Sequence, residues 1–243
     1  MATGFPESPD FPEFYPTDVM ETVHDLIFKW VPRMIIFGLY LTKKAPFHTV
    51  YLHGLVNDAK GKKMSKSKGN VVNPLTLTEK YGTDSLRMAL IVGNTPGADL
   101  ALQEDKIKAY KNFANKIWNI ARFVLSSTEN KPNQKPEQIS KKDAEYIKEF
   151  EDLVKDITAD MENYRFYLSA EKIYHYLWHT FADKIIEESK ADINNTSTKY
   201  MLRYIFEQSL VILHPFMPFV TEEIWSYIPR DDKKLLIVTK WPK

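Results

Sequence analysis

The sequence predicts a mostly α-helical protein, in which a small α/β portion with a parallel sheet precedes an antiparallel helical bundle. Three observations favour this class. Residues 48–56 form a short run of β-branched and aromatic side chains, residues 57–73 are rich in lysine, glycine and serine, and apolar side chains recur with helical spacing from residue 103 onward. We divide the chain accordingly into residues 1–56, 57–102 and 103–243.

The composition limits the class of protein. Of the 243 residues, 44% are hydrophobic, which suffices for one large or two modest cores. Lys and Arg number 33 against 32 Asp and Glu, so any RNA-binding surface must be a local patch. The absence of cysteine excludes disulfides, thiolate metal sites and cysteine nucleophiles. No apolar run approaches the ~18 residues of a membrane span, so we expect a cytoplasmic protein without a membrane partner.

The first portion should contain one helix and one strand. Residues Thr17 to Leu41 carry a dense apolar run with helical spacing, which predicts a buried helix with Pro32 as the residue able to kink it. His48 to Val56 shows no alternation, the pattern of a strand buried on both faces of a parallel sheet. Because one strand and one helix cannot complete such a sheet, we expect the rest of it elsewhere, in a longer chain.

A loop and a compact linking unit should follow. Residues 57–73, NDAKGKKMSKSKGNVVN, contain almost no large apolar side chains and are predicted to form a mobile cationic loop. Pro74 to Tyr81 and Asp84 to Val92 are predicted to form short helices, and the sequence NTPGAD that follows them is predicted to be a turn.

The rest of the chain should be a bundle of antiparallel helices. Four stripes of apolar residues step by three or four positions, which is the spacing of a helix face. A polar segment, residues 129–140, separates the first two helices, and Thr221 is predicted to cap a short fifth helix. The stripes comprise Ile107, Tyr110, Ala114, Ile117, Ala121 and Val124; Ile147, Phe150, Val154, Ile157 and Met161; Phe166, Ala170, Ile173, Leu177, Phe181 and Ile185; and Met201, Ile205 and Ile212.

The most informative segment is Lys63-Met64-Ser65-Lys66-Ser67, followed by Gly69-Asn70. A lysine-rich loop directly after a buried strand lies where α/β folds bind ligands, and its cations suit a polyphosphate. Lysine runs in general are more often solvated surface loops. This string nevertheless resembles the KMSKS signature of class I aminoacyl-tRNA synthetases, with His53-Gly54 before it and a helix containing Lys80-Tyr81-Gly82 after it.

The resemblance implies a fold, an activity and site residues. It implies the C-terminal part of a Rossmann-type catalytic domain, a KMSKS and stem-contact linker, and an α-helical anticodon-binding domain. The reaction implied is activation of an amino acid with ATP (with Mg2+) as substrate, in which negative charge builds on the leaving pyrophosphate. Lys66 would be the principal cation that stabilises this charge and Lys63 its partner, with Ser65 and Ser67 as hydroxyl donors and Met64 packed beneath the loop.

Nearly the whole chain, from Phe14 to Pro242, is similar to the valine members of this class. The similarity rests on the segments FYPTDVMET, FKWVPRMI, PFHTVYLHGLV and TPGADL, and on YKNFANKIWN from Tyr110 to Asn119. It implies valine, ATP and tRNA(Val) as partners. The segment from Leu213 to Trp225 is similar to the valine, isoleucine and leucine members alike, so isoleucine or leucine specificity is an alternative.

Further site residues follow from the resemblance alone. Asp25 would hydrogen-bond the adenosine, and Trp30 would form one wall of the amino-acid pocket or else be an ordinary core residue. At His53 and Gly54 the strand end would let adenine approach the backbone, because glycine has no side chain to block it. The sequence departs from the family where Val23 and His24 replace an expected glycine and aromatic residue, and where Lys29 replaces an apolar one.

The helical bundle would dock the tRNA and read its anticodon bases by stacking and hydrogen bonding. Its candidate tRNA-binding residues are Lys111, Asn112, Lys116, Asn119 and Arg122, for which ordinary solvated surface is the alternative. The family's other signature, a His-x-Gly-His type element, does not occur in this sequence, and the inserted editing domain is absent. We therefore expect the isolated chain to be inactive as a ligase, and a stand-alone tRNA-binding module is the competing hypothesis. We expect neither a metal site nor a DNA partner.

Overall fold

The computed structural model describes residues 4–128, 133–230 and 234–242, apart from the side chain of Lys66. The chain forms two compact units. The first comprises Met1–Val71 with Asn94–Ala101, and the second comprises Val72–Gly93 with Leu102–Lys243. The predicted linker, residues 57–102, is thus divided between the two units, each of which we describe by itself.

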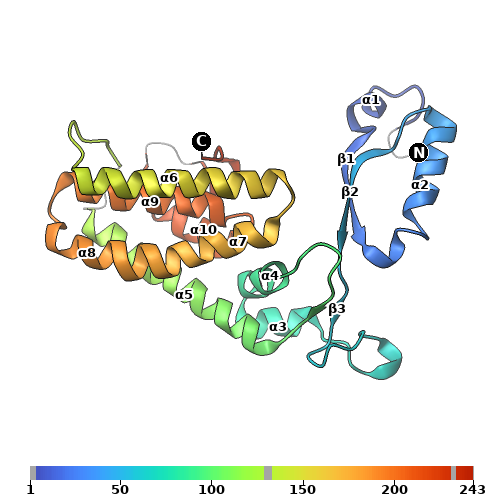
Figure 1. Cartoon of the computed structure of the whole chain (residues 1–243), viewed down its shortest axis with the longest axis horizontal. Coiled ribbons are helices and arrows are strands. Elements are labelled where there is room, and N and C mark those ends of the chain that lie inside the picture. Colours follow the sequence, from blue (N-terminus) through green and yellow to red (C-terminus); the bar gives the residue numbers. More distant parts are fainter. Residues whose placement is uncertain (1–3, 129–132, 231–233, 243) are drawn as a thin grey trace. The chain divides into compact units, whose positions relative to one another are not determined.

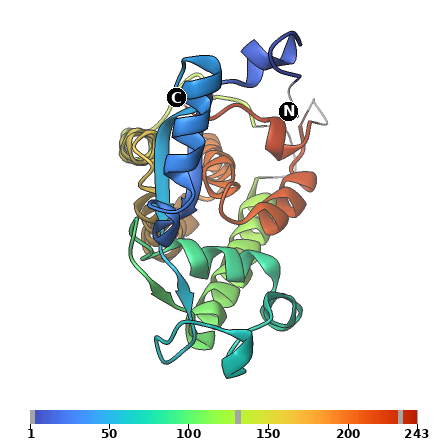
Figure 2. The ribbon, with the colours of Figure 1, turned by 90° about the vertical axis from the view of Figure 1, so that its right-hand side faces the viewer.

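The first unit is built around a pair of parallel strands. A short helix, α1 (Asp10–Phe14), precedes β1 (Thr17–Val23), and a 3-10 turn (His24–Leu26) leads into α2 (Val31–Thr42) and then β2 (Phe47–His53). Thr17 lies opposite Phe47 and Val23 opposite His53. Helix α2 is the crossover between the strands and runs alongside them (Figure 2). Both strands therefore end at the same edge, next to the His24–Leu26 turn.

The predicted buried helix from Thr17 to Leu41 is wrong in two respects. Its first seven residues form β1, in which β-branched threonine and valine favour a strand. The helix α2 starts only at Val31, and Pro32 lies in its first turn, where the missing N–H is not needed and no kink results. Val31 is the buried residue of this helix, whereas Ile36 and Phe37 are each 64% exposed. The apolar spacing correctly predicts a helix, but it does not predict that apolar side chains such as Ile36 and Phe37 are exposed.

The predicted parallel strand exists, with corrected ends and burial. It is β2, which stops at His53; after Gly54 and Leu55 the chain continues as β3 (Val56–Asn57), parallel to β4 (Leu100–Ala101). The side chains of β2 are half-buried or, at His48, exposed, so burial on both faces is wrong for this chain. Strand β2 pairs with β1, so the sheet has a second strand within this chain.

The two short helices of the linking segment are confirmed and belong to the second unit. They are α3 (Pro74–Tyr81), whose N-cap Asn73 accepts a hydrogen bond from the Leu75 N–H, and α4 (Thr83–Ile91). The lysine-rich loop before them belongs to the first unit and contains a short 3-10 turn, Lys66–Lys68. Loop and helices, adjacent in sequence, are thus parts of different compact units.

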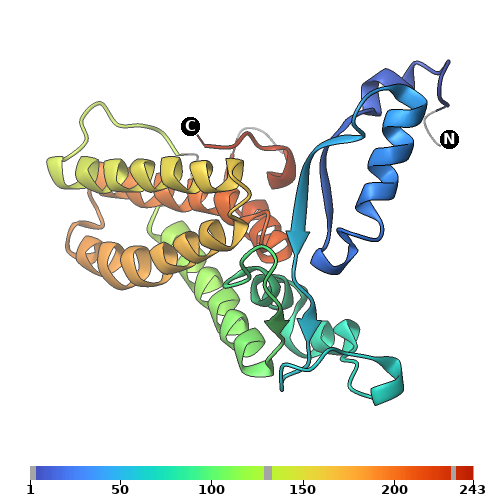
Figure 3. The same cartoon turned by 45° about the vertical axis from the view of Figure 1, so that its right-hand side comes forward.

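The second unit contains the predicted helical bundle. Its elements are α5 (Glu104–Ser127), α6 (Lys141–Glu162), α7 (Phe166–His175) with a π-helical continuation (Tyr176–Ile186), α8 (Glu187–Ser189), a 3-10 turn (Lys190–Asp192), α9 (Thr196–Leu213), α10 (Pro218–Ser226) and a 3-10 turn (Leu236–Val238). Helices α6 and α7 run side by side (Figures 1 and 3). The predicted stripes supply much of the core, including Ile107, Ile117, Val124, Phe150, Ile157, Ile173, Phe181 and Ile205, each at most 1% exposed.

Thr221 does not cap the last helix as predicted. Helix α10 begins at Pro218, and Thr221 lies inside it, where its Oγ1 donates to the Met217 carbonyl at 2.8 Å. The capping acceptor is instead Asp84 of α4, which accepts the backbone N–H groups of Phe219 and Val220 at 3.2 and 2.7 Å.

Among the described residues, no helix combines the length and apolar character needed to cross a membrane.

Candidate functional site

A hydrogen-bonded base supports the KMSKS loop. Asp58 Oδ1 accepts the backbone N–H groups of Lys60 and Lys62 at 3.0 and 2.9 Å, which makes a tight turn. Asn70, at the other end of the loop, donates from Nδ2 to Asp58 Oδ2 at 2.8 Å and accepts the Ser65 N–H at 2.9 Å. These bonds, with that from Asn70 the strongest, hold the pKa of Asp58 below its usual value. Asp58 and Asn70 together fix the path of the loop.

The side chains of the KMSKS segment differ in what they contact. Lys63 is 65% exposed, and its Nζ lies 3.3 Å from Asp25 Oδ2. The hydroxyls of Ser65 and Ser67 are hydrogen-bonded to each other at 2.6 Å. Met64 is half-buried, and the side chain of Lys66 lies outside the described part of the structure. Lys63 is therefore the predicted catalytic lysine whose surroundings the structure gives, and it is paired with a carboxylate.

Position 54 has room only for glycine, because the backbone at Ala98 passes directly beside it. A β-carbon at this position would lie 1.7 Å from the carbonyl oxygen of Ala98, in the turn that precedes β4. The neighbouring His53 donates from Nδ1 to the Gly54 carbonyl at 2.8 Å, and its Nε2 lies 3.2 Å from Glu21 Oε1 on β1. The close approach of Ala98 gives the glycine a structural reason, and the approach of adenine to these two residues stays a prediction.

His24 contacts carboxylates from two segments of the candidate site and was not among the predicted site residues. Its Nδ1 lies 3.1 Å from Asp25 Oδ1 and its Nε2 lies 3.0 Å from Asp99 Oδ1. Asp99 also accepts the Leu55 N–H at 2.8 Å. The pKa of Asp99 is lowered, most strongly by the His24 hydrogen bond. The available signal was an ionisable ring, directly before Asp25, at a position where an aromatic residue was expected.

Trp30 and Asp25 lie in the segment between β1 and α2. Trp30 is 53% exposed, so the alternative that it is an ordinary core residue of this chain is wrong. Its role as a wall of the amino-acid pocket stays a prediction, as does the contact of Asp25 with adenosine. The described residues bring together no group of three His, Asp or Glu side chains that could hold a metal ion.

The candidate tRNA-binding residues on α5 fall into two groups. Lys111 Nζ donates to the Lys80 carbonyl at 3.1 Å, and Lys116 pairs with Asp183 at 2.8 Å while its Nζ lies 5.5 Å from the centre of the Trp178 ring. Their charges are thus already engaged within the protein. Exposed and without such partners in the described part of the chain are Asn112, Asn119 and Arg122.

Arg122 also borders a cavity of about 470 Å³ between α5 and α10. Its wall is mainly apolar and includes two aromatic rings, those of Trp118 and Tyr227, which meet edge to face at 5.9 Å. Trp118 is 37% exposed and Tyr227 is 56% exposed. The other lining residues are Ala121, Leu125, Ser126 and Ile224. An exposed cation beside accessible rings is a combination that suits an unstacked base.

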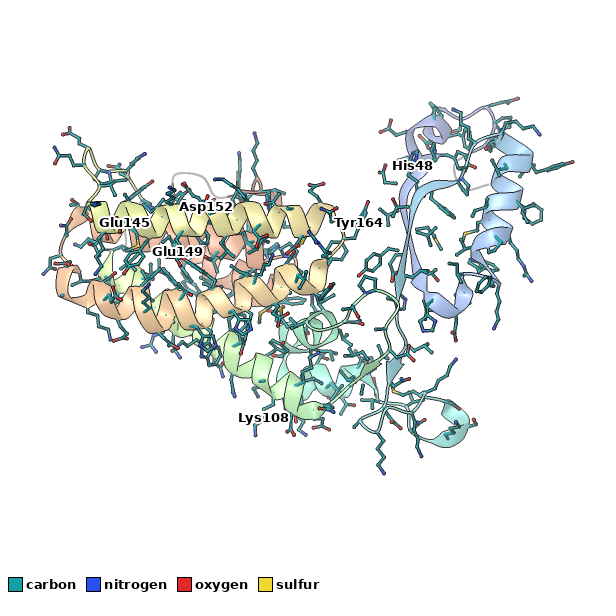
Figure 4. The ribbon with its side chains drawn as sticks, viewed as in Figure 1. His48, Lys108, Glu145, Glu149, Asp152 and Tyr164 are labelled. Carbon is teal, nitrogen blue, oxygen red and sulfur yellow. The ribbon has the colours of Figure 1, made fainter. Side chains whose placement is uncertain are left out.

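Three carboxylates lie along another helix of the bundle. Glu145, Glu149 and Asp152 follow one another along α6 at helical spacing (Figure 4). Asp152 is paired with Lys155 at 2.8 Å, and its pKa is lowered by this lysine. The row is therefore partly neutralised within the helix itself.

Comparisons with known proteins assign the family. A sequence profile described as tRNA synthetases class I (I, L, M and V) matches residues 1–103, and one described as the anticodon-binding domain of tRNA ligase matches residues 143–243. The chain belongs to the class I aminoacyl-tRNA synthetases.

Curated synthetases resemble the chain along nearly all of its length. It is 41% identical to a valine--tRNA ligase of Pelagibacter ubique, over 98% of the chain and 29% of that relative. A valine--tRNA ligase of Clostridium tetani is 39% identical, over 99% of the chain and 28% of the relative. The chain thus spans less than a third of the length of these relatives.

Solved synthetase structures share the fold. A leucyl-tRNA synthetase from Agrobacterium radiobacter, solved with tRNA and LeuAMS, matches with a TM-score of 0.79 at 20% identity, over 96% of this chain and 29% of that one. Methionyl-tRNA synthetase from Mycobacterium tuberculosis, with methionyl-adenylate, matches with a TM-score of 0.76 at 22% identity, over 92% and 47% of the two chains. The predicted class, a Rossmann-type remnant followed by a helical anticodon-binding domain, is confirmed.

Proposed function

We propose that this chain is part of a valine–tRNA ligase, to which it contributes the KMSKS loop and the anticodon-binding bundle. The observation that carries the proposal is the near-40% identity, over almost the whole chain, with valine--tRNA ligases from several organisms. Its substrates would be valine, MgATP and tRNA(Val). Isoleucine or leucine specificity is the alternative within the same family.

The KMSKS loop would act in the first step, the activation of valine. The valine carboxylate attacks the α-phosphorus of ATP, the bond between this phosphorus and the oxygen that bridges it to the β-phosphate breaks, and pyrophosphate leaves with the additional negative charge. A cation close to the β- and γ-phosphates stabilises that charge as it forms, and loss of one preorganised donor typically costs about 2.7–4 kcal/mol in the transition state. We assign this role to Lys66, with Lys63 as its partner.

The contacts of Lys63 suggest how the loop would respond to ATP. Its ammonium group lies 3.3 Å from a single carboxylate, Asp25, and both side chains are substantially exposed. Exposed ion pairs of this kind contribute only about 0–1 kcal/mol. A polyphosphate carries more charge than one carboxylate, so it would compete effectively for Lys63. The ion pair would hold the lysine near the site until the nucleotide arrives.

The bundle would act on the tRNA. Anticodon bases are unstacked and can lie on aromatic rings, each contributing about 1–3 kcal/mol. Arg122 and the rings of Trp118 and Tyr227 offer such a surface beside α5. Asn112 and Asn119 are exposed on the same helix and can hydrogen-bond base edges.

The test is binding of the purified chain to tRNA transcripts over a range of salt concentrations. We expect tRNA(Val) to bind more tightly than tRNA(Ile) and tRNA(Leu), and a tRNA(Val) with a substituted middle anticodon base to lose that advantage. Equal, steeply salt-dependent binding to all four transcripts would mean only a basic surface and would contradict the proposal.

A valine-dependent ATP–pyrophosphate exchange assay on the same chain separates the two competing hypotheses. We propose that the chain alone does not support exchange, because one cationic loop cannot by itself hold ATP and valine in line. Exchange above background would contradict this and would show that the chain activates valine by itself. Specific tRNA binding without exchange is also what a stand-alone tRNA-binding module would give. Restoration of exchange by added catalytic-domain polypeptide from a valine--tRNA ligase would favour the ligase, and failure to restore it would favour the module.

A further inference from the structure

His24 bridges two carboxylates that come from different segments of the first unit. Its two ring nitrogens lie 3.1 Å from Asp25 Oδ1 and 3.0 Å from Asp99 Oδ1. The contact of Nε2 with Asp99 is a hydrogen bond, and Nδ1 lies within ion-pair distance of the neighbouring Asp25 carboxylate. His24 therefore contacts both carboxylates at once.

Each carboxylate is tied to another part of the candidate site. Asp25 Oδ2 lies 3.3 Å from Lys63 Nζ in the KMSKS loop, and Asp99 accepts the backbone N–H of Leu55 at 2.8 Å. The contacts thus run without a gap from the loop, through the turn after β1, to the turn before β4 and the backbone that follows β2. His24 is the central group of this chain of contacts.

We infer that His24 is a positioning residue, whose ring holds the Asp25 carboxylate where it meets Lys63 and the nucleotide, and holds the Asp99 turn over the end of β2. The part of this inference that concerns the nucleotide rests on the proposed function; the bridge itself does not. An aromatic residue, which the family resemblance leads us to expect here, could not hydrogen-bond either carboxylate. The bridge is therefore a property of this sequence.

The bridge should weaken in acid, because its hydrogen bond requires an ionised Asp99, whose pKa is lowered most strongly by His24. The other groups around it are Lys63 beside Asp25, the Asn57 side chain and the Leu55 N–H on Asp99, and the Glu21–His53 pair at the ends of the two strands. No lysine or arginine side chain contacts Asp99 in the described part of the chain.

The experiment compares wild type with His24→Phe, which supplies the aromatic ring the family leads us to expect. The control is His48→Phe, because His48 (Figure 4) is exposed and lies near the start of β2, whereas the end of β2 at His53 pairs with Val23, next to His24. The Asp99 carboxylate is titrated by NMR in the whole chain, and hydrogen exchange of the Leu55 amide is followed across the same pH range.

In His24→Phe we expect the pKa of Asp99 to rise toward its ordinary value, because the largest cause of its lowering is removed, and the Leu55 amide to exchange about two- to tenfold faster. In wild type and His48→Phe the pKa of Asp99 should stay lowered. Protection of Leu55 should fall as the pH drops through the pKa of Asp99, and this loss should begin at a higher pH in His24→Phe. An Asp99 pKa that is the same in wild type and His24→Phe would overturn the inference.

A titration with MgATP then separates the bridge from the proposed nucleotide role. We expect MgATP to shift the Lys63 amide signal in wild type and to bind about two- to tenfold more weakly to His24→Phe, while His48→Phe binds as wild type does. Equal affinity in wild type and His24→Phe would overturn the positioning role. If MgATP shifts no loop amide even in wild type, the nucleotide role fails, whereas the Asp99 titration still decides the bridge.

Discussion

The β-carbon that Gly54 lacks would lie 1.7 Å from the carbonyl oxygen of Ala98. That oxygen belongs to the turn before β4, which is fixed because the Leu100 N–H donates to the Leu55 carbonyl at 2.8 Å. Backbone lies on both sides of the contact, so no flexible side chain can move aside. An added methyl group has to push the turn away from the end of β2.

Gly54→Ala should therefore disrupt the first unit locally. Overpacking of this kind costs about 1–3 kcal/mol, and we expect protection of the Leu100 amide against hydrogen exchange to fall by roughly tenfold or more. Gly61→Ala is the matched control, since its β-carbon would meet nothing within 4 Å and only its positive φ of 73° is unfavourable. Loss of protection at Leu100 in the control as well would contradict the steric explanation.

Asn70→Ala should release the KMSKS loop. Because the Asn70 hydrogen bond is the largest cause of the lowered pKa of Asp58, that pKa should rise toward its ordinary value of 3.8. A depressed carboxyl pKa gives stability that is present above the unfolded value and lost as the pH falls through the folded one. Wild-type loop amides should therefore lose protection in acid, and the variant should already lack it at neutral pH. Asn119→Ala, on exposed α5 surface, is the control for both NMR measurements.

Asp84 should be necessary for the start of α10. Asp84→Ala removes the acceptor for two backbone N–H groups at a site that is only 6% exposed, so we expect a loss of about 1–3 kcal/mol in the free energy of unfolding. Burial raises the pKa of Asp84, so its linked stabilisation is complete below 3.8 and is lost as the pH rises through the folded value. Asp84→Asn should lack this pH-dependent stabilisation. Denaturant unfolding at several pH values should show wild type gaining on Asp84→Asn as the pH falls, and a constant difference would contradict the assignment.

Arg203 is a buried cation, 1% exposed, that pairs with Glu207 on the same helix. It also donates to Thr128 Oγ1 at 3.2 Å and to the Pro229 carbonyl at 3.3 Å. Arg203→Ala leaves Glu207, whose side chain is 16% exposed, without its ion-pair partner, and we expect a cost of about 3–5 kcal/mol in denaturant unfolding. Replacing both residues by methionine should cost less than Arg203→Ala alone. A double variant as unstable as the single one would show that the uncompensated charge is not the cause.

On α5, Arg122 and Lys116 should differ in their contribution to tRNA binding. Arg122 is exposed beside the Trp118 ring, whereas Lys116 is neutralised by Asp183. Arg122→Ala should weaken binding of tRNA(Val) by roughly 1–3 kcal/mol, as for loss of a base or phosphate contact, and lower the salt dependence. Lys116→Ala should have a smaller effect. Filter binding at several salt concentrations gives both quantities, and equal effects would contradict the distinction.

Much of the helical bundle could be predicted from the sequence, because each long helix has a continuous core to face. Ile117, Phe150 and Ile205 belong to three different apolar stripes with helical spacing. Each of them is fully or almost fully buried. The first unit was harder, since its strand β1 has no clear alternation and α2 exposes residues such as Phe37 that are apolar enough to suggest a core.

The candidate site was predictable where a motif was present and not where contacts are distant in sequence. The KMSKS string marked the loop, but nothing local to Asp58 indicates that Asn70, 12 positions away, completes its support. The pairing of His24 with Asp99 spans 75 positions. The cap of α10 by Asp84 spans 135 and 136 positions. The local sequence therefore points to a nearer hydroxyl, that of Thr221, as the cap.

The path of the chain passes between the two units three times, after Val71, after Gly93 and after Ala101. A single proteolytic cut at any one of these points leaves two covalent connections intact. Neither unit can be expressed as one uninterrupted stretch, since the first needs residues 94–101 for β4 and Asp99, and the second needs α3 and α4. A chimera that exchanges the anticodon-binding bundle with that of a relative must therefore move residues 72–93 with it, or Asp84 will be lost from the start of α10.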